Sequence, residues 1–93
     1  MNQQQRRAVV SVIGKDQVGI ISKVTTILSD NNINILDISQ TILQDFFTMM
    51  MLVDVSKRDN LDDLNKQFEE LSTQLHLKIN IQLEEIFQSM HRV

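Results

Sequence analysis

The chain of 93 residues is 42% apolar and 23% charged, with a formal net charge of −3 and a pI near 5.2, which predicts one small globular domain with a thin core. Because cysteine is absent, disulfides and thiolate metal sites are excluded. The acidic balance also argues against nucleic-acid binding, which requires a clustered basic surface.

The first half of the chain predicts a strand followed by a helix, after a start at residues 1–5 that we expect to be disordered. Segment 8–14, AVVSVIG, is short, β-branched and apolar on both alternating faces, which is typical of a central strand. From 18 to 31 apolar residues recur at helical spacing. Asp16 is positioned to cap the first turn of this helix, and Asn31 or Asn32 can adopt the left-handed conformation that ends it.

The middle of the chain predicts an antiparallel hairpin. Segment 33–43 returns to β-branched alternation, and segment 46–55 is a second strand that is apolar on both faces. A tight connection around Gln44 and Asp45 joins them, although it lacks the Asn-Gly signal of a two-residue turn.

The second half predicts a helix, a strand and a helical tail. Asn60 is expected to cap the helix, and its apolar stripe steps by three and four through Leu61, Leu64, Phe68, Leu71 and Leu75. In segment 76–84 apolar and polar residues alternate strictly, as in an edge strand with one solvent-exposed face. Residues 85–93 put Ile86, Phe87, Met90 and Val93 on one side of a short helix, which needs a protein surface to receive it because so short a helix is unstable in water.

This order of elements predicts an α+β fold, a ferredoxin-like βαββαβ sandwich with a four-stranded antiparallel sheet, two helices on one face and a short C-terminal helix. In that topology the first and third strands are central, and the second and fourth lie at the edges. The second predicted strand is too apolar for an edge left bare to water, so we expect a second copy of the chain to cover it.

The chain's two glycines, Gly14 and Gly19, stand between the first strand and the first helix. Backbone N–H groups at such a helix start attract anionic groups. The spacing begins like a phosphate-binding Walker A loop, but isoleucines 20 and 21 replace its Lys and Ser or Thr, so phosphate transfer is excluded. A small carboxylate fits such a loop better, with Asp16 facing an ammonium group. From the residues alone a purely structural role is favoured, in which Gly14 ends the strand and Gly19 lets the helix approach the sheet closely.

The segments GKDQVGIISKVTTILSDNNINILDISQTI and FFTMMMLVDV resemble an ACT domain, and the tail EEIFQSMHRV is similar to the EDIFNAMHRI ending of free-standing bacterial ACT proteins. The resemblance runs from about residue 7 to 93 and implies a single ACT domain over residues 1–93. It also implies a homodimer joined through the second strand and a small amino acid as the ligand. Many relatives have proline where this chain has Val18, which leaves the loop less pre-organised.

The resemblance further implies which residues contact the ligand. Asp16, Gln17, Val18, Gly19 and Ile20 of one subunit would face the start of the second strand in its partner, where Asn34 and Ile35 stand.

We expect neither catalysis nor a metal or cofactor. His76 and His91 fall in different predicted elements without a third metal ligand, and no serine has a histidine at a motif spacing. The longest apolar run, 49–53, is too short to cross a bilayer, and no signal peptide is evident, so a cytoplasmic protein is the plain interpretation.

The sequence therefore predicts a non-catalytic regulatory module that binds a small amino acid at a homodimer interface. The alternative is an interaction adaptor that binds an unidentified protein partner, an enzyme or a transcription regulator, without a small ligand of its own. Free-standing ACT proteins similar to the glycine-cleavage anti-activator illustrate that alternative.

Overall fold

A computed structural model of the chain describes residues 6–57 and 60–84. Its elements are β1 (Arg7–Lys15), α1 (Ile20–Asp30), β2 (Asn34–Leu43), β3 (Phe46–Asp54), α2 (Asp62–Leu75) and β4 (Leu77–Leu83). The order is the predicted one. The disorder predicted for residues 1–5 and the helical tail predicted for 85–93 lie outside the described residues.

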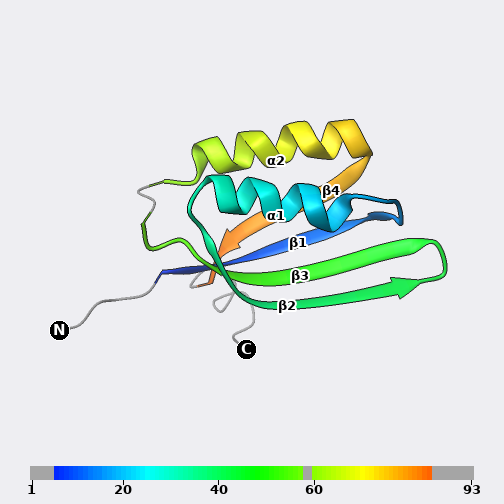
Figure 1. Ribbon diagram of the computed structural model, residues 1–93, viewed down its shortest axis with the longest axis horizontal. Helices are drawn as coiled ribbons and strands as arrows, with labels where there is room; N and C mark the ends of the chain where they lie inside the picture. The colour runs from blue at the N-terminus through cyan, green and yellow to red at the C-terminus, as the bar shows by residue number, and fades with distance from the viewer. Residues whose placement is uncertain (1–5, 58–59, 85–93) are drawn as a thin grey trace, which may run out of the picture.

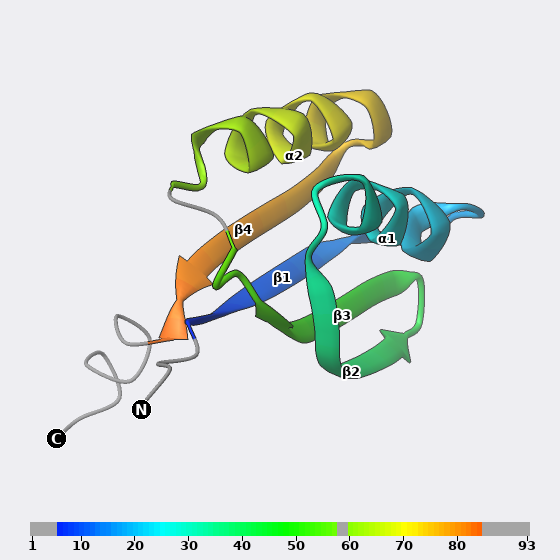
Figure 2. The same cartoon turned by 60° about the vertical axis from the view of Figure 1, so that its left-hand side comes forward.

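The four strands form one antiparallel sheet in the order β2-β3-β1-β4. Both helices lie on the same face of this sheet, so the fold has two layers (Figures 1 and 2). The ferredoxin-like prediction is confirmed, with β1 and β3 in the centre and β2 and β4 at the edges. The opposite sheet face, which we call the open face, is not covered by either helix.

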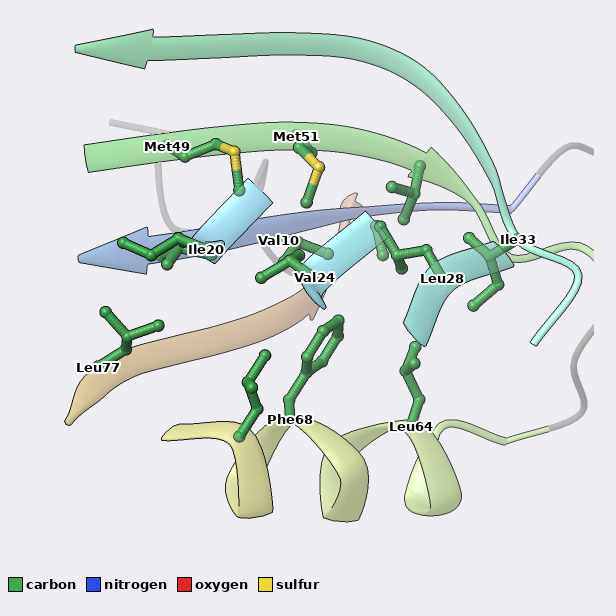
Figure 3. Close-up of a cluster of buried hydrophobic side chains, with 14 of the residues drawn as sticks. Val10, Ile20, Val24, Leu28, Ile33, Met49, Met51, Leu64, Phe68 and Leu77 are labelled. Carbon is green, nitrogen blue, oxygen red and sulfur yellow. The ribbon is translucent and has the colours of Figure 1, made fainter. Parts of the chain in front are cut away.

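The core fills the space between the helices and the sheet (Figure 3). Alternate residues of the central strands point into it, so Met49 and Met51 are buried while Met50 between them is 41% exposed on the open face. The two helices contribute buried apolar stripes, listed as Ile20, Val24 and Leu28 of α1 and Leu64, Phe68 and Leu71 of α2. The predicted core stripe of the second helix is confirmed.

In the described part of the chain, three residues other than glycine adopt the left-handed conformation, and each lies in a turn or at a helix end. Asn32, after α1, has a φ of 58°, and Gln44, in the hairpin, has a φ of 57°. Both turns lie where the sequence predicts them. His76 also has a φ of 57° and closes α2, so β4 starts one residue later than predicted. Its backbone N–H donates to the carbonyl of Ser72.

The free edge of β2 exposes apolar side chains on both faces. Ile38, Ile42 and Leu43 are 44%, 56% and 70% exposed. A register irregularity between Ile35 and Asp37 puts Leu36 outside the regular pairing with β3. Neither helix shields the second half of this strand (Figure 2).

Candidate functional site

The two glycines between β1 and α1 serve different structural needs. A Cβ on Gly14 would lie 2.5 Å from Leu77 Cδ2 and 3.3 Å from Leu77 Cα, so this glycine lets β4 approach β1. Gly19 has a φ of 93° and is the N-cap residue of α1. A side chain there would meet only ordinary contacts, the nearest being Lys23 Cε at 3.7 Å, but it would strain the backbone.

The loop between β1 and α1 is fixed to two distant segments. The backbone N–H of Asp16 donates to the carbonyl of Asp45 at 2.8 Å, which ties the loop to the β2–β3 turn. Gln17 Nε2 donates to the carbonyl of Leu75 at 2.9 Å and so reaches the last residue of α2. Both contacts hold the loop at one end of the sheet (Figure 1).

The prediction that Asp16 caps α1 is wrong. β1 continues to Lys15 and α1 begins at Ile20, so Asp16 lies too far from the first turn to cap it. Among the described residues, the Asp16 carboxylate has no hydrogen-bond partner, and it is exposed. This carboxylate is therefore open to an outside donor.

Within residues 6–57 and 60–84, no protein acceptor meets the backbone donors at the start of α1. Its first turn contains no acidic residue, and no side chain caps it. The N–H groups of Ile20, Ile21 and Ser22 therefore point out of the helix end, where the helix dipole favours an anion. Val18 beside them is 98% exposed, whereas the Ile20 side chain is buried in the core. Ile20 can consequently meet a ligand through its backbone only.

Asn34 and Ile35 lie at the other end of α1, about 16 Å away by the length of that helix. One chain therefore does not bring the two groups of predicted site residues together. Asn34 is exposed and Ile35 is half-buried.

A hollow of about 860 Å³ surrounds Asn34 and Ile35. Its other lining residues, which sequence reasoning missed, are Thr25, Thr26, Ser29, Asn32, Ile33, Asp54, Ser56 and Lys57. The helical period could have grouped Thr25, Thr26 and Ser29 on one face, but no sequence signal brings Asp54 and Lys57 beside them.

Some further groupings can be tested within the described residues. Within residues 6–57 and 60–84, no group of three or more His, Cys, Asp or Glu side chains is placed to hold a metal ion. No helix in this part of the chain is long and apolar enough to cross a membrane.

The comparisons with known proteins agree with this architecture. The ACT domain family matches residues 6–82. A UPF0237 protein of Clostridium perfringens is 51% identical over 87 residues, which cover 92% of this chain and 98% of the relative. One of Neisseria meningitidis serogroup A is 53% identical over 90 residues, with 92% and 97% covered.

A solved ACT domain protein from Streptococcus pneumoniae has the same fold, with a TM-score of 0.79 and 38% identity. The similarity covers 90% of this chain and 96% of that one. Together with the family match, it shows that this chain belongs to the ACT-domain family.

Proposed function

We propose that this chain is a non-catalytic regulatory module that binds a small amino acid at a homodimer interface. ACT domains are regulatory, ligand-binding modules. The observation that carries the proposal is the start of α1, which presents backbone N–H groups with neither a side-chain cap nor an acidic residue to occupy them. A carboxylate suits these donors, and the Lys23 side chain, whose Cε lies 3.7 Å from the Cβ position of Gly19, stands beside the same helix start.

The proposed dimer joins two copies through β2. This edge has unpaired backbone groups and exposed apolar side chains, which favour pairing with another strand. Two copies related by a two-fold axis would pair their β2 strands antiparallel, so the start of one strand would lie beside the end of the other.

This pairing would also complete the ligand site. The end of β2 leads into the turn at Asp45, and the Asp45 carbonyl holds the backbone of Asp16. Asn34 at the start of one β2 strand would therefore lie within a few strand spacings, about 10–15 Å, of the loop between β1 and α1 in the other subunit. A ligand between the two would contact both subunits.

In the proposed complex, the ligand carboxylate accepts hydrogen bonds from the N–H groups at the start of α1. The Asp16 carboxylate receives the ligand ammonium, and Asn34 of the partner subunit supplies further hydrogen bonds. Gln17 is already committed to the Leu75 carbonyl, so its role is to hold the loop. Gly19 and Val18 shape the approach to the helix end.

A thermal-shift screen of the twenty amino acids tests ligand binding, since a ligand at 100 times its Kd stabilises a protein by about 2.7 kcal/mol. Calorimetry with the best ligand then compares Asn34→Ala with Asn80→Ala, a matched change at an exposed position on β4. We expect Asn34→Ala to weaken binding by about 1–3 kcal/mol and Asn80→Ala to leave it unchanged. Equal affinities of both variants and the parent would remove Asn34 from the site.

Light scattering tests the dimer separately. Ile42→Lys places a charge on the exposed β2 edge, and Ile13→Lys makes the same change at a similarly exposed position of β1. We expect only the β2 variant to be monomeric at micromolar concentration. If no amino acid shifts the melting temperature and the parent is still a dimer, the adaptor alternative replaces the ligand-binding proposal.

A further inference from the structure

The open face of the sheet carries an apolar patch on its two central strands. We call Val9, Ile13, Met50 and Leu52 the open-face patch. These side chains alternate with the core residues of β1 and β3 and so point away from the helices. Ile13 and Met50 are 47% and 41% exposed, and Val9 and Leu52 are half-buried. An apolar surface in the middle of a sheet is suited to receive apolar side chains.

A hollow of about 200 Å³ opens within this patch. Val9, Met50 and Leu52 form its apolar wall, and Asp37 and Ser39 of β2 line it from the other side. This volume exceeds the cavity of about 150 Å³ that holds a benzene ring in another protein. One phenyl side chain therefore fits, with a carboxylate close by.

The chain leaves β4 next to this patch. Leu83 is paired with Ala8, and the next residue, Glu84, forms a bidentate ion pair with Arg7. The distances are 2.9 Å from Nε to Oε1 and 2.7 Å from Nη2 to Oε2. Alternation from Ala8 and Leu83 puts Arg7 and Glu84 on the open face, so the last described side chain lies on the side of the sheet that carries the patch.

Residues 85–93 are long enough to reach the hollow. From β4, the strands that carry the patch lie one and two strand spacings away, about 5 and 10 Å. Phe87 follows Glu84 by three residues, which span about 10 Å when extended, and Arg92 follows it by eight, which span about 27 Å. Their sequence supplies Phe87 for the hollow and Arg92 for Asp37.

We propose that residues 85–93 of the same chain cover the open-face patch, with the Phe87 ring in the hollow and Arg92 beside Asp37. The covering segment removes the patch from contact with a second sheet. Association between copies is then directed to the β2 edge, where the exposed apolar side chains remain.

A single tryptophan tests the proposal, because the chain contains none. In the Phe87→Trp chain we expect blue-shifted emission and weak quenching by acrylamide. Adding Met50→Asp places a charge in the hollow and should shift the emission to the red and raise quenching severalfold. Thr48→Asp, a matched change on the same strand and face but outside the hollow, should leave both unchanged. The proposal is overturned if the tryptophan of the Phe87→Trp chain is solvent-exposed. It is also overturned if adding Met50→Asp leaves the emission unchanged.

Mixed dimers distinguish docking of residues 85–93 on their own chain from docking on the partner subunit. The Phe87→Trp chain is assembled with an excess of chains that carry Met50→Asp and no tryptophan. Emission that stays blue-shifted supports docking within one chain. A red shift means that the tail occupies the partner's patch, and it overturns the proposal.

A second measurement tests the proposal without Met50→Asp, in case that substitution disturbs folding. The chain has no cysteine, so Ser39→Cys gives one thiol on the rim of the hollow. We expect maleimide to label it severalfold more slowly in the full chain than in a chain lacking residues 85–93. Equal labelling rates overturn the proposal.

Discussion

The two helices of this domain begin in opposite ways. The N-cap residue of α2 is Leu61 and not the predicted Asn60. Asn60, one residue earlier, still accepts through Oδ1 a hydrogen bond from the N–H of Asp62 at 3.0 Å, and the first turn contains Asp62 and Asp63. α1 follows Gly19, with no side-chain acceptor and no acidic residue in its first turn. At α2, one N-terminal donor has a side-chain acceptor and two carboxylates stand at the positive dipole end, whereas the start of α1 has neither among the described residues.

This difference indicates where the domain can gain an interaction. A capped helix start stabilises the fold by about 1 kcal/mol, and leaving one uncapped gives up that stability unless another group binds there. The uncapped start is the one that emerges from the glycine-bounded loop, beside the exposed Asp16 carboxylate. The comparison therefore separates a helix start built for stability from one suited to a ligand.

The largest effect on ligand binding is expected when the start of α1 receives a carboxylate of its own. Ser22→Asp puts a carboxylate at the third position of the helix, where it can accept from the free N–H groups. We expect the folded state to gain about 0.3–1 kcal/mol and the ligand to bind at least about tenfold more weakly, a change of about 1.4 kcal/mol. Chemical denaturation and calorimetry measure the two effects.

The neutral variant Ser22→Asn controls for the size of the new side chain, since Ser22 is exposed and both substitutions fit the same space. We expect it to retain most of the binding. Unchanged affinity in Ser22→Asp would mean that the ligand carboxylate does not occupy the start of α1.

A second prediction concerns the two glycines that precede α1. Gly19→Ala should lower the free energy of unfolding by about 1–2 kcal/mol, because φ is 93° there. Gly19→Asn should lose less, since asparagine tolerates the left-handed conformation. At Gly14 the obstacle is the space taken by Leu77, so Gly14→Asn should be no better than Gly14→Ala. Urea denaturation of the four variants measures this, and a rescue by asparagine at both positions would contradict it.

The sequence predicts the fold well where side-chain periodicity reflects burial. The stripe from Leu61 to Leu75 and the alternation of β4 both identify the face that meets the core. The alternation also predicts that Met50 faces away from Met49 and Met51. These features depend on local geometry, which a single sequence contains.

Features set by contacts between distant segments are harder to predict. Asp16 looks like a cap because the helix pattern can be extended back to Val18, but pairing of Lys15 with Phe46 lengthens β1 and moves the helix start to Ile20. The hollow near Asn34 likewise combines the outer face of α1 with the last residue of β3 and residues that follow it. The proposed site also includes residues of a second subunit. The periodicity of one chain does not indicate which residues that subunit would contribute.

The smallest effect is expected at the start of α2. Asn60→Ala removes the acceptor for the Asp62 N–H, so the free energy of unfolding should fall by about 1 kcal/mol. For a domain of this size, that loss lowers the melting temperature by about 4–8 °C. Ligand affinity should not change, because α2 starts at the end of the molecule away from the loop between β1 and α1 (Figure 1). Asn65→Ala, an exposed change inside the same helix, should cost much less, since alanine favours a helix interior. A loss of ligand binding in Asn60→Ala would show that the two helix starts are coupled, and the separation of roles drawn from their chemistry would then be wrong.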